Sequence, residues 1–347
     1  MIAHSVVFPG ANRVDFEVRD LPEPGPGQVL LRTLVSLISI GTELTLLDGN
    51  HPPGSFWASY GGYPVRPGFG QVAEVVAVGP DVETVRPNNR VLSSLGHCSA
   101  SIAAADRLYP LPPEVYPEEA VFHTIAAGVI GAVRLGKVSL GQSAVVVGLG
   151  LLGQLAVRLA WLAGARPVIA VDLSTERLEM ARLGGATAAL SPSAVDLNAE
   201  VGRLTRGRMA DVVLEMTGSP DAIPMALRLV RPEGRYVQVG CPRGKTTLDF
   251  HEAVLVPGLH IVGAFFARQT TRETPENPWT RRRNAELFLD LVQDGSLEVA
   301  SLITHRYPWR EAPQAYGMLQ GNRARALGVL FDWSDSPQAE AKPADAR

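Results

Sequence analysis

Hydrophobic and polar positions alternate along this chain in two ways, and each pattern predicts a different kind of domain. From residue 143 to about residue 266, short apolar runs alternate with segments whose apolar residues recur at helical spacing. This alternation predicts an α/β domain with a doubly wound parallel sheet. Residues 1–120 instead carry short apolar segments separated by clusters of Pro, Gly and Asn. They predict a compact, barrel-like β-rich domain.

The same patterns locate individual elements. We expect strands at residues 29–35, 70–78, 144–147, 168–171, 211–216, 234–240 and 260–266, and helices at residues 117–135, 151–162, 174–183, 220–230 and 286–293. The leucine stripe of the helix at 151–162 leaves Gln154 and Arg158 off its apolar face. Between residues 48 and 66 we expect a long loop, and from Ser334 onward a disordered tail.

A glycine-rich turn follows the strand at 144–147 and has the form G-x-G-x-x-G, with glycines at 148, 150 and 153. Gly148 allows a tight exit from the strand, Gly150 lets the backbone approach a pyrophosphate, and Gly153 lets helix and strand pack closely. The helix N-terminus supplies N–H groups for the phosphates. Asp172 ends the next strand, 19 residues after Gly153, where a carboxylate can accept hydrogen bonds from the adenine ribose. We therefore expect a site for NAD.

Composition narrows the choice of partners and compartment. The chain has 347 residues and a formal net charge of -3, so we expect about two domains and neither nucleic acid nor a membrane surface as partner. Two cysteines cannot form a disulfide framework or a four-cysteine zinc site. The N-terminus lacks the pattern of a signal peptide, and no apolar run is long enough to span a bilayer. We expect a soluble, cytoplasmic protein.

A β-rich domain followed by this glycine motif and a short return segment resembles the medium-chain dehydrogenase/reductase superfamily, over about residues 1–333. The segments Glu215–Ser219 and Gln238–Gly240 look like that family's coenzyme loops. The resemblance implies a GroES-like domain at 1–122 completed by 268–333, a Rossmann domain at 123–267, and a homodimer or dimer of dimers. The expected coenzyme contacts are Gly148, Gly150, Leu151, Leu152, Gly153, Asp172, Leu173, Arg177, Thr217, Gly218, Val239 and Gly240.

Most alcohol and polyol dehydrogenases of this family carry a catalytic zinc, and this sequence departs from their pattern. Ile40 stands where the first ligand is normally Cys, and Phe69 where the second is normally His. The third ligand position falls on His123 or Thr124. Because tetrahedral zinc sites need three protein ligands, we expect no metal. The Ser39–Glu43 signature is similar to that of a zinc-lacking branch which includes the bacteriochlorophyllide hydroxyethyl dehydrogenases.

The resemblance implies an NAD-dependent dehydrogenase that interconverts a secondary alcohol and a ketone. Two alternatives stay open: a zinc-free reductase of quinones or conjugated C=C bonds, and a non-catalytic NAD(H)-binding protein. The reductases usually prefer NADPH, which Asp172 disfavours, although Arg177 is placed to neutralise a phosphate.

Three residues are candidates for proton transfer. The first choice for the base is His123, with an ordinary pKa of about 6.5. Thr42 matches the family's proton-relay hydroxyl, and Glu43 would orient His123 or act as the base itself. The aromatic residues Trp57, Tyr60 and Tyr63 of the long loop are candidate substrate contacts, or they pin the loop to its own domain.

Overall fold

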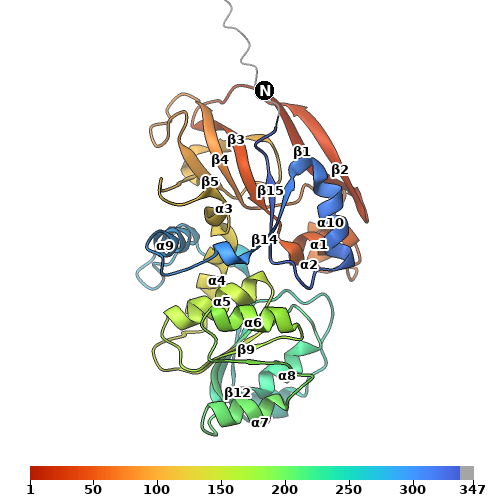
Figure 1. Ribbon diagram of the computed structural model, residues 1–347, viewed down its shortest axis with the longest axis vertical. Helices are drawn as coiled ribbons and strands as arrows, with labels where there is room; N and C mark the ends of the chain where they lie inside the picture. Colours follow the sequence, from red (N-terminus) through yellow and green to blue (C-terminus); the bar gives the residue numbers. More distant parts are fainter. Residues whose placement is uncertain (337–347) are drawn as a thin grey trace, which may run out of the picture. The chain divides into compact units, whose positions relative to one another are not determined.

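The computed structural model describes residues 1–336, which fall into two units: Met1–Thr124 with the residues from Glu298 onward, and Ile125–Leu297 (Figure 1). We expected residues 268–297 to belong to the first unit, but they pack with the second. Arg134 lies over the Trp279 ring, 3.2 Å from Cζ to the ring centroid, and its Nε donates to Asn284 Oδ1. Most of the tail predicted from Ser334 lies outside the described residues; within them, Arg310 pairs with Asp335.

Unit 1 is built on β-strands, as its turn-rich sequence predicts. The strands are β1 (Ile2–Gly10), β2 (Arg13–Asp20), β3 (Gln28–Leu37), β4 (Gln71–Val78), β5 (Arg90–Ser93), β6 (Ala100–Ala104), β7 (Tyr109–Pro110), β14 (Ile303–Pro308) and β15 (Gly328–Asp332). They form a sheet in the order β14-β15-β3-β4-β5-β7, with β6 also paired to β3, and a separate β1-β2 hairpin. All these strand pairs are antiparallel except β14 with β15. The central strand β3 is mostly buried because it has neighbours along both edges.

The helices of unit 1 come from both of its chain segments. They are α1 (Ile40–Asp48), α2 (Phe56–Tyr60), α3 (Pro117–Ala120), α4 (His123–Leu135, where the units divide) and α10 (Ala312–Gly321), with 3-10 turns at Ala105–Arg107, Ala300–Leu302 and Trp309–Glu311. We did not predict α10, whose buried residues Ala312, Ala315, Tyr316 and Leu319 recur at helical spacing. They join a core that contains Trp57, Phe331 and Trp333.

Unit 2 confirms the predicted Rossmann sheet. Its strands are β8 (Ala144–Val147), β9 (Val168–Val171), β10 (Ala188–Leu190), β11 (Ala210–Glu215), β12 (Val230–Gln238) and β13 (His260–Gly263). All neighbours are parallel, in the order β10-β9-β8-β11-β12-β13. The chain order reverses beside β8, and dinucleotides bind outside the carboxyl ends of the strands at such a switch point.

Helices lie on both faces of this sheet, with α5 and α6 on one face and α7 and α8 on the other (Figure 1). The helices are α5 (Leu151–Leu162), α6 (Thr175–Leu183), α7 (Leu197–Leu204), α8 (Ala222–Arg228) and α9 (Arg281–Gln293), with short turns at His251–Leu255 and Phe266–Arg268. Gln154 and Arg158, which lie off the leucine stripe of α5, are also buried. The reason is that α6 packs against that side of the helix: Gln154 Nε2 donates to the carbonyl of Arg177 at 2.8 Å.

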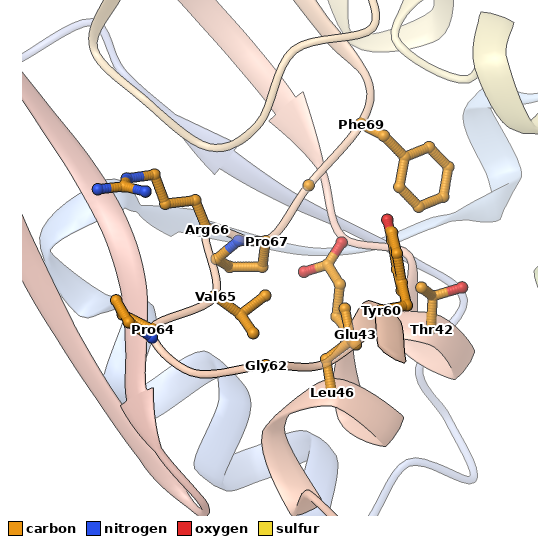
Figure 2. Close-up of a pocket in the computed structure, with 11 residues that line it drawn as sticks. Thr42, Glu43, Leu46, Tyr60, Gly62, Pro64, Val65, Arg66, Pro67 and Phe69 are labelled. Carbon is orange, nitrogen blue, oxygen red and sulfur yellow. The ribbon is translucent and has the colours of Figure 1, made fainter. Parts of the chain in front are cut away.

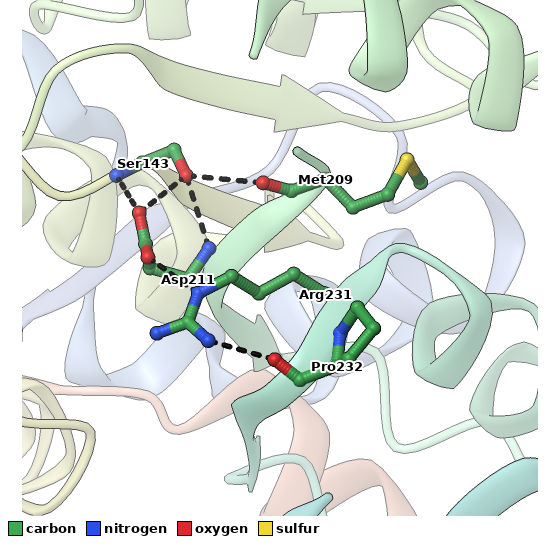
Figure 3. Close-up of polar contacts among 5 residues, drawn as sticks. All are labelled: Ser143, Met209, Asp211, Arg231 and Pro232. Atoms are coloured by element: carbon green, nitrogen blue, oxygen red, sulfur yellow. Dashed lines mark hydrogen bonds and ion pairs between the residues drawn. The ribbon is translucent and has the colours of Figure 1, made fainter. Parts of the chain in front are cut away.

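A polar cluster ties together the amino ends of three strands in this sheet (Figure 3). Asp211 Oδ2 accepts from both the N–H and the hydroxyl of Ser143 at 2.8 Å, and Asp211 Oδ1 accepts from Arg231 Nε at 2.7 Å. Burial alone would raise the pKa of Asp211, but these hydrogen bonds lower it below its ordinary value. The cluster fixes β8, β11 and β12 against one another. Across the described residues, no helix is both long and apolar enough to cross a membrane.

Candidate functional site

The glycine motif forms the loop between β8 and α5. Gly148 adopts a φ of 89°, and a Cβ there would lie 2.6 Å from Thr217 Cγ2. A Cβ on Gly153 would lie 1.9 Å from the Gly148 carbonyl oxygen, so helix and strand touch at this point. At Gly150, by contrast, an added Cβ would meet nothing within 4 Å. The protein itself thus leaves room beside Gly150, at the N-terminus of α5, where a pyrophosphate fits.

Asp172 follows β9 and is fixed by two backbone donors. Its Oδ2 accepts from the N–H of Leu149 at 2.6 Å, and its Oδ1 accepts from the N–H of Ser174 at 2.8 Å. The carboxylate is therefore held beside the glycine loop, in the place where an adenine ribose would lie. Each carboxylate oxygen accepts more than one hydrogen bond, so the ribose hydroxyls still find acceptors.

Two further loops end beside Gly148. Glu215, at the end of β11, is fully buried and accepts from the N–H of Thr217 at 2.7 Å and from Gln238 Nε2 at 2.6 Å. A Cβ on Gly240 would lie 2.2 Å from the N atom of Gly218. The loops after β11 and β12 are thus packed into one surface, and this contact explains the glycines in both.

The remaining predicted coenzyme residues border the same edge of the sheet. Leu151 and Val239 are buried, and they shape the loop from inside. Leu152 and Arg177 are partly exposed, and Leu173 is well exposed. The structure therefore brings the whole predicted set to the carboxyl ends of β8, β9, β11 and β12, and this set fits a dinucleotide.

Unit 1 contains a cavity of about 240 Å³ whose floor is the first turn of α1 (Figure 2). It is lined by Thr42, Glu43, Leu46, Tyr60, Gly62, Pro64, Val65, Arg66, Pro67, Gly68 and Phe69. Thr42 is partly exposed, and its hydroxyl has no hydrogen-bond partner among the described residues. The structure therefore places Thr42, Glu43 and Tyr60, three of the predicted site residues, around one space.

Glu43 is fully buried and is held by three donors. Its Oε1 accepts from the N–H of Ser39 at 2.7 Å, and its Oε2 accepts from the hydroxyl of Tyr316 and lies 3.1 Å from His97 Nε2. A second chain of contacts continues from His97 Nδ1 to Ser36 Oγ, which accepts from Trp333 Nε1. Three donors stabilise the carboxylate in its charged form. Glu43 therefore acts as a fixed negative charge in the cavity wall.

The prediction that His123 is the base is contradicted by its surroundings. His123 is 1% exposed, its Nδ1 lies 3.2 Å from the carbonyl oxygen of Ala120, and its Nε2 lies 3.0 Å from Thr124 Oγ1. Burial lowers the pKa of His123 to about 4. It does not line the cavity, and Glu43 contacts His97 rather than His123. Neither the expected pKa near 6.5 nor the expected orientation by Glu43 is present.

Of the three aromatic residues expected to contact substrate, only Tyr60 lines the cavity. Trp57 is 8% exposed and packs in the core of the unit. The Tyr63 hydroxyl donates to the carbonyl oxygens of Leu46 and Leu47. For Trp57 and Tyr63 these contacts favour the alternative, that both rings pin the 48–66 segment to its own unit.

The donor set at the expected metal position does not fit zinc. Ile40 packs against the hydrophobic core, and Phe69 lines the cavity (Figure 2). Neither side chain has an atom that binds zinc, which takes sulfur, nitrogen or oxygen ligands. Within residues 1–336, no group of three or more His, Cys, Asp and Glu side chains is arranged to hold a metal ion.

Sequence reasoning missed His97 and Tyr316, whose side chains hydrogen-bond to Glu43. For Tyr316 a signal was available, because it lies in an apolar stripe at helical spacing and a buried tyrosine hydroxyl needs a partner. For His97 there was none: it lies between Gly96 and Cys98 in a loop, and only the fold brings it to α1.

Comparison with known proteins gives consistent matches. Residues 152–278 match the family model described as zinc-binding dehydrogenase. The chain is 30% identical, over 88% of its own length and 91% of the other, to the L-threonine 3-dehydrogenase of Pyrococcus horikoshii. It is 32% identical over 60% of each chain to the D-guloside 3-dehydrogenase of Escherichia coli strain K12.

The fold matches solved structures of the same kind. An alcohol dehydrogenase from Thermus sp. ATN1 superimposes with a TM-score of 0.77 at 24% identity, covering 95% of this chain and 99% of the other. This likeness confirms the predicted pairing of a β-rich domain with a Rossmann sheet.

Proposed function

Because this chain belongs to the zinc-binding, medium-chain dehydrogenase family, an oxidoreductase group that acts on CH–OH, we propose that it is a zinc-independent, NAD-dependent dehydrogenase. It interconverts a secondary alcohol and a ketone by hydride transfer. The bound coenzyme supplies or takes up the hydride, and the side chains of the chain itself bind the substrate and move the proton.

One observation carries the zinc-free part of this proposal. The cavity keeps the hydroxyls of Thr42 and Tyr60 and the carboxylate of Glu43, whereas Ile40 and Phe69 occupy the two zinc-ligand positions. A cavity without catalytic function would not need a buried carboxylate held by three hydrogen-bond donors, because burying a charge is costly. Hydroxyl groups beside a fixed charge support proton transfer without a metal.

The preference for NAD is supported by Asp172. Its carboxylate is fixed beside the glycine loop by Leu149 and Ser174. There it accepts from ribose hydroxyls and repels a 2′-phosphate, because two anions would lie within hydrogen-bond distance of each other. Thr42 would act as the relay hydroxyl, since it lines the cavity and its oxygen has no protein partner in the described chain.

The names of the two relatives support a secondary alcohol as substrate. L-threonine 3-dehydrogenase and D-guloside 3-dehydrogenase both name a carbon that carries a hydroxyl between two carbons. The cavity also suits a polar ligand, because it is lined by the polar side chains of Thr42, Glu43, Tyr60 and Arg66. We propose a polar secondary alcohol, without choosing between amino acids, sugars and polyols.

The proposal is tested by assaying chelator-treated protein with NAD against L-threonine, a methyl guloside, galactitol and butane-2,3-diol, and with NADH against the matching ketones. We expect coenzyme reduction with at least one alcohol. A second test uses the variant Thr42→Val, whose side chain has nearly the same shape as the native residue but lacks the hydroxyl. Its coenzyme binding should persist while turnover falls. If wild-type protein turned over no member of the panel with either coenzyme, the proposal would be wrong.

We also propose that unit 2 forms a homodimer, or the dimers of a larger assembly, through the edge strand β13. Among the described strands, β13 pairs only with β12. Its Ile261 is exposed, as are Phe250, Leu255 and Val256 just before it. An open sheet edge with apolar side chains favours pairing with a second copy. Analytical ultracentrifugation should find a dimer in the wild type and a monomer in Ile261→Glu; a wild-type monomer would contradict it.

A further inference from the structure

We propose that the Tyr60 hydroxyl holds the reacting oxygen of the substrate and exchanges the proton with it. This inference rests on the proposed dehydrogenase function and assigns the proton-transfer step to a residue first expected only as a substrate contact. It depends on three features: the position of Tyr60, a hydroxyl that is not hydrogen-bonded to another described residue, and the charge of Glu43 beside it.

The position of Tyr60 is fixed by the short helix α2. Ser55 caps this helix by accepting from the N–H of Ala58, and Trp57 anchors it in the core. Tyr60 is the last residue of α2, and its ring stacks on Phe56 with centroids 5.5 Å apart and planes at 14°. Figure 2 shows its hydroxyl pointing into the space between the Glu43 carboxylate and the Phe69 ring. A ligand in the cavity would therefore meet this hydroxyl.

The hydroxyl of Tyr60 is available to such a ligand, unlike those of Tyr63 and Tyr316. Tyr63 donates to the carbonyl oxygens of Leu46 and Leu47, and Tyr316 donates to Glu43. Tyr60 has no hydrogen-bond partner within the described part of the chain. The Tyr60 side chain is 51% exposed, so its hydroxyl meets solvent, and a substrate oxygen bound in the cavity would take the place of that water.

Burial and the charge of Glu43 both favour the protonated form of Tyr60. Burial raises the pKa of Tyr60, and the negative charge of Glu43 raises it further. The other groups near it are Arg66, whose charge is paired with Glu17 by two hydrogen bonds, and His51, which packs against Gly61. Tyr60 is therefore protonated at neutral pH and acts there as a donor. We do not assign the base role to Glu43, because its side chain is fully buried and held in place by Ser39, His97 and Tyr316.

In ketone reduction, the bound coenzyme would supply a hydride, with its electron pair, to the carbonyl carbon, and the π pair of the carbonyl would move onto the oxygen. That oxygen takes the proton of Tyr60, and the phenolate regains a proton from water. Oxidation runs in reverse, with the phenolate taking the hydroxyl proton. Because little phenolate exists at neutral pH, oxidation should become faster as the pH rises.

The experiment compares Tyr60→Phe with wild type. The substitution keeps the ring and its stacking on Phe56 and removes only the oxygen. We expect kcat to fall about a hundredfold in both directions, with the NADH dissociation constant unchanged and the alkaline rise of the oxidation rate lost. The control is Tyr116→Phe, which removes the same atom from a side chain that is 73% exposed and outside the cavity. Its kcat should match wild type.

The outcomes separate this inference from the proposed function. If wild type oxidises alcohols and Tyr60→Phe keeps kcat within about threefold and the same pH profile, Tyr60 does not move the proton, while the dehydrogenase function stands. A rise in KM with kcat unchanged would also overturn the inference, because it would show a binding role only. If wild type has no turnover with any alcohol or ketone of the panel, both fail together.

Discussion

His97 Nε2 lies 3.1 Å from Glu43 Oε2, and both side chains are buried. The contacts around the pair indicate which nitrogen of His97 faces each neighbour. Ser36 Oγ accepts from Trp333 Nε1, so its own hydrogen is free to point to His97 Nδ1. The imidazole then carries its hydrogen on Nε2 and donates it to Glu43. In this arrangement each ring nitrogen of His97 has a partner.

This arrangement predicts a stability cost for removing one donor to Glu43. Tyr316→Phe keeps the aromatic packing and removes the hydroxyl that donates to the carboxylate. Hydrogen bonds to charged groups contribute about 1.5–3 kcal/mol, so the free energy of unfolding in urea should fall by about 2 kcal/mol. Tyr116→Phe should change it by less than about 0.5 kcal/mol. Equal stability of the two variants would mean that Glu43 does not need this donor.

The burial of His123 predicts a pH dependence of stability. Burial lowers its pKa to about 4 in the folded protein, whereas an unfolded histidine has a pKa of about 6.5. The unfolded chain therefore binds more protons between these values, and stability falls as the pH falls through this range. The loss is about 2.5 kcal/mol at pH 4.5 relative to pH 7.

Urea unfolding followed by tryptophan fluorescence at pH 7 and pH 4.5 measures this loss. His123→Gln should lose less stability over the same interval than wild type, whatever its stability at pH 7. If wild type and His123→Gln lost the same free energy of unfolding between pH 7 and pH 4.5, His123 would titrate as an ordinary exposed histidine. The base role rejected above would then return.

The space beside Gly150 predicts a substitution that affects only the coenzyme. Gly150→Ala adds a Cβ that meets no protein atom within 4 Å, at a φ of -63° that any residue adopts. The melting temperature should stay within about 2 °C, while NADH binding weakens at least about tenfold because the methyl group blocks the pyrophosphate. The matched control is Gly202→Ala in α7, where the Cβ meets only Met209 Sδ at 3.6 Å. Unchanged NADH binding in Gly150→Ala would place the pyrophosphate elsewhere.

Asp172 predicts the choice between the two coenzymes. Repulsion between its carboxylate and a 2′-phosphate costs on the order of 2–3 kcal/mol, or roughly tens- to hundredfold in affinity. Fluorescence titration should therefore show tighter binding of NADH than of NADPH, and Asp172→Asn should narrow the difference. Equal or tighter binding of NADPH by wild type would mean that Arg177 neutralises the phosphate.

The sequence predicted the coenzyme unit better than the cavity, for a physical reason. Residues 143–172 place their strand, glycine turn, helix and acid within one continuous segment, so local pattern determines the geometry. The cavity depends on side chains far apart in the sequence: His97 comes from a loop, and Tyr316 from a helix that follows α1 by more than 260 residues. Such contacts form only once the fold is complete.

The same limit explains the errors at His123 and in the aromatic loop. Its ordinary pKa made His123 attractive as a base, but burial, which depends on tertiary packing, lowers that pKa. From the sequence alone, nothing distinguished the roles of the three loop aromatics, Trp57, Tyr60 and Tyr63. Their separate roles follow from a one-turn helix that turns Trp57 into the core and Tyr60 into the cavity.

The central claim, a dehydrogenase that works without zinc, is tested most directly by measuring metal content and turnover on the same preparation. Purified protein should contain well under one zinc per chain by elemental analysis. The rate with NAD and the best alcohol of the panel should be unchanged after incubation with a strong chelator and removal of the chelate. Loss of turnover with the chelator, and its return when zinc alone is added, would contradict the account.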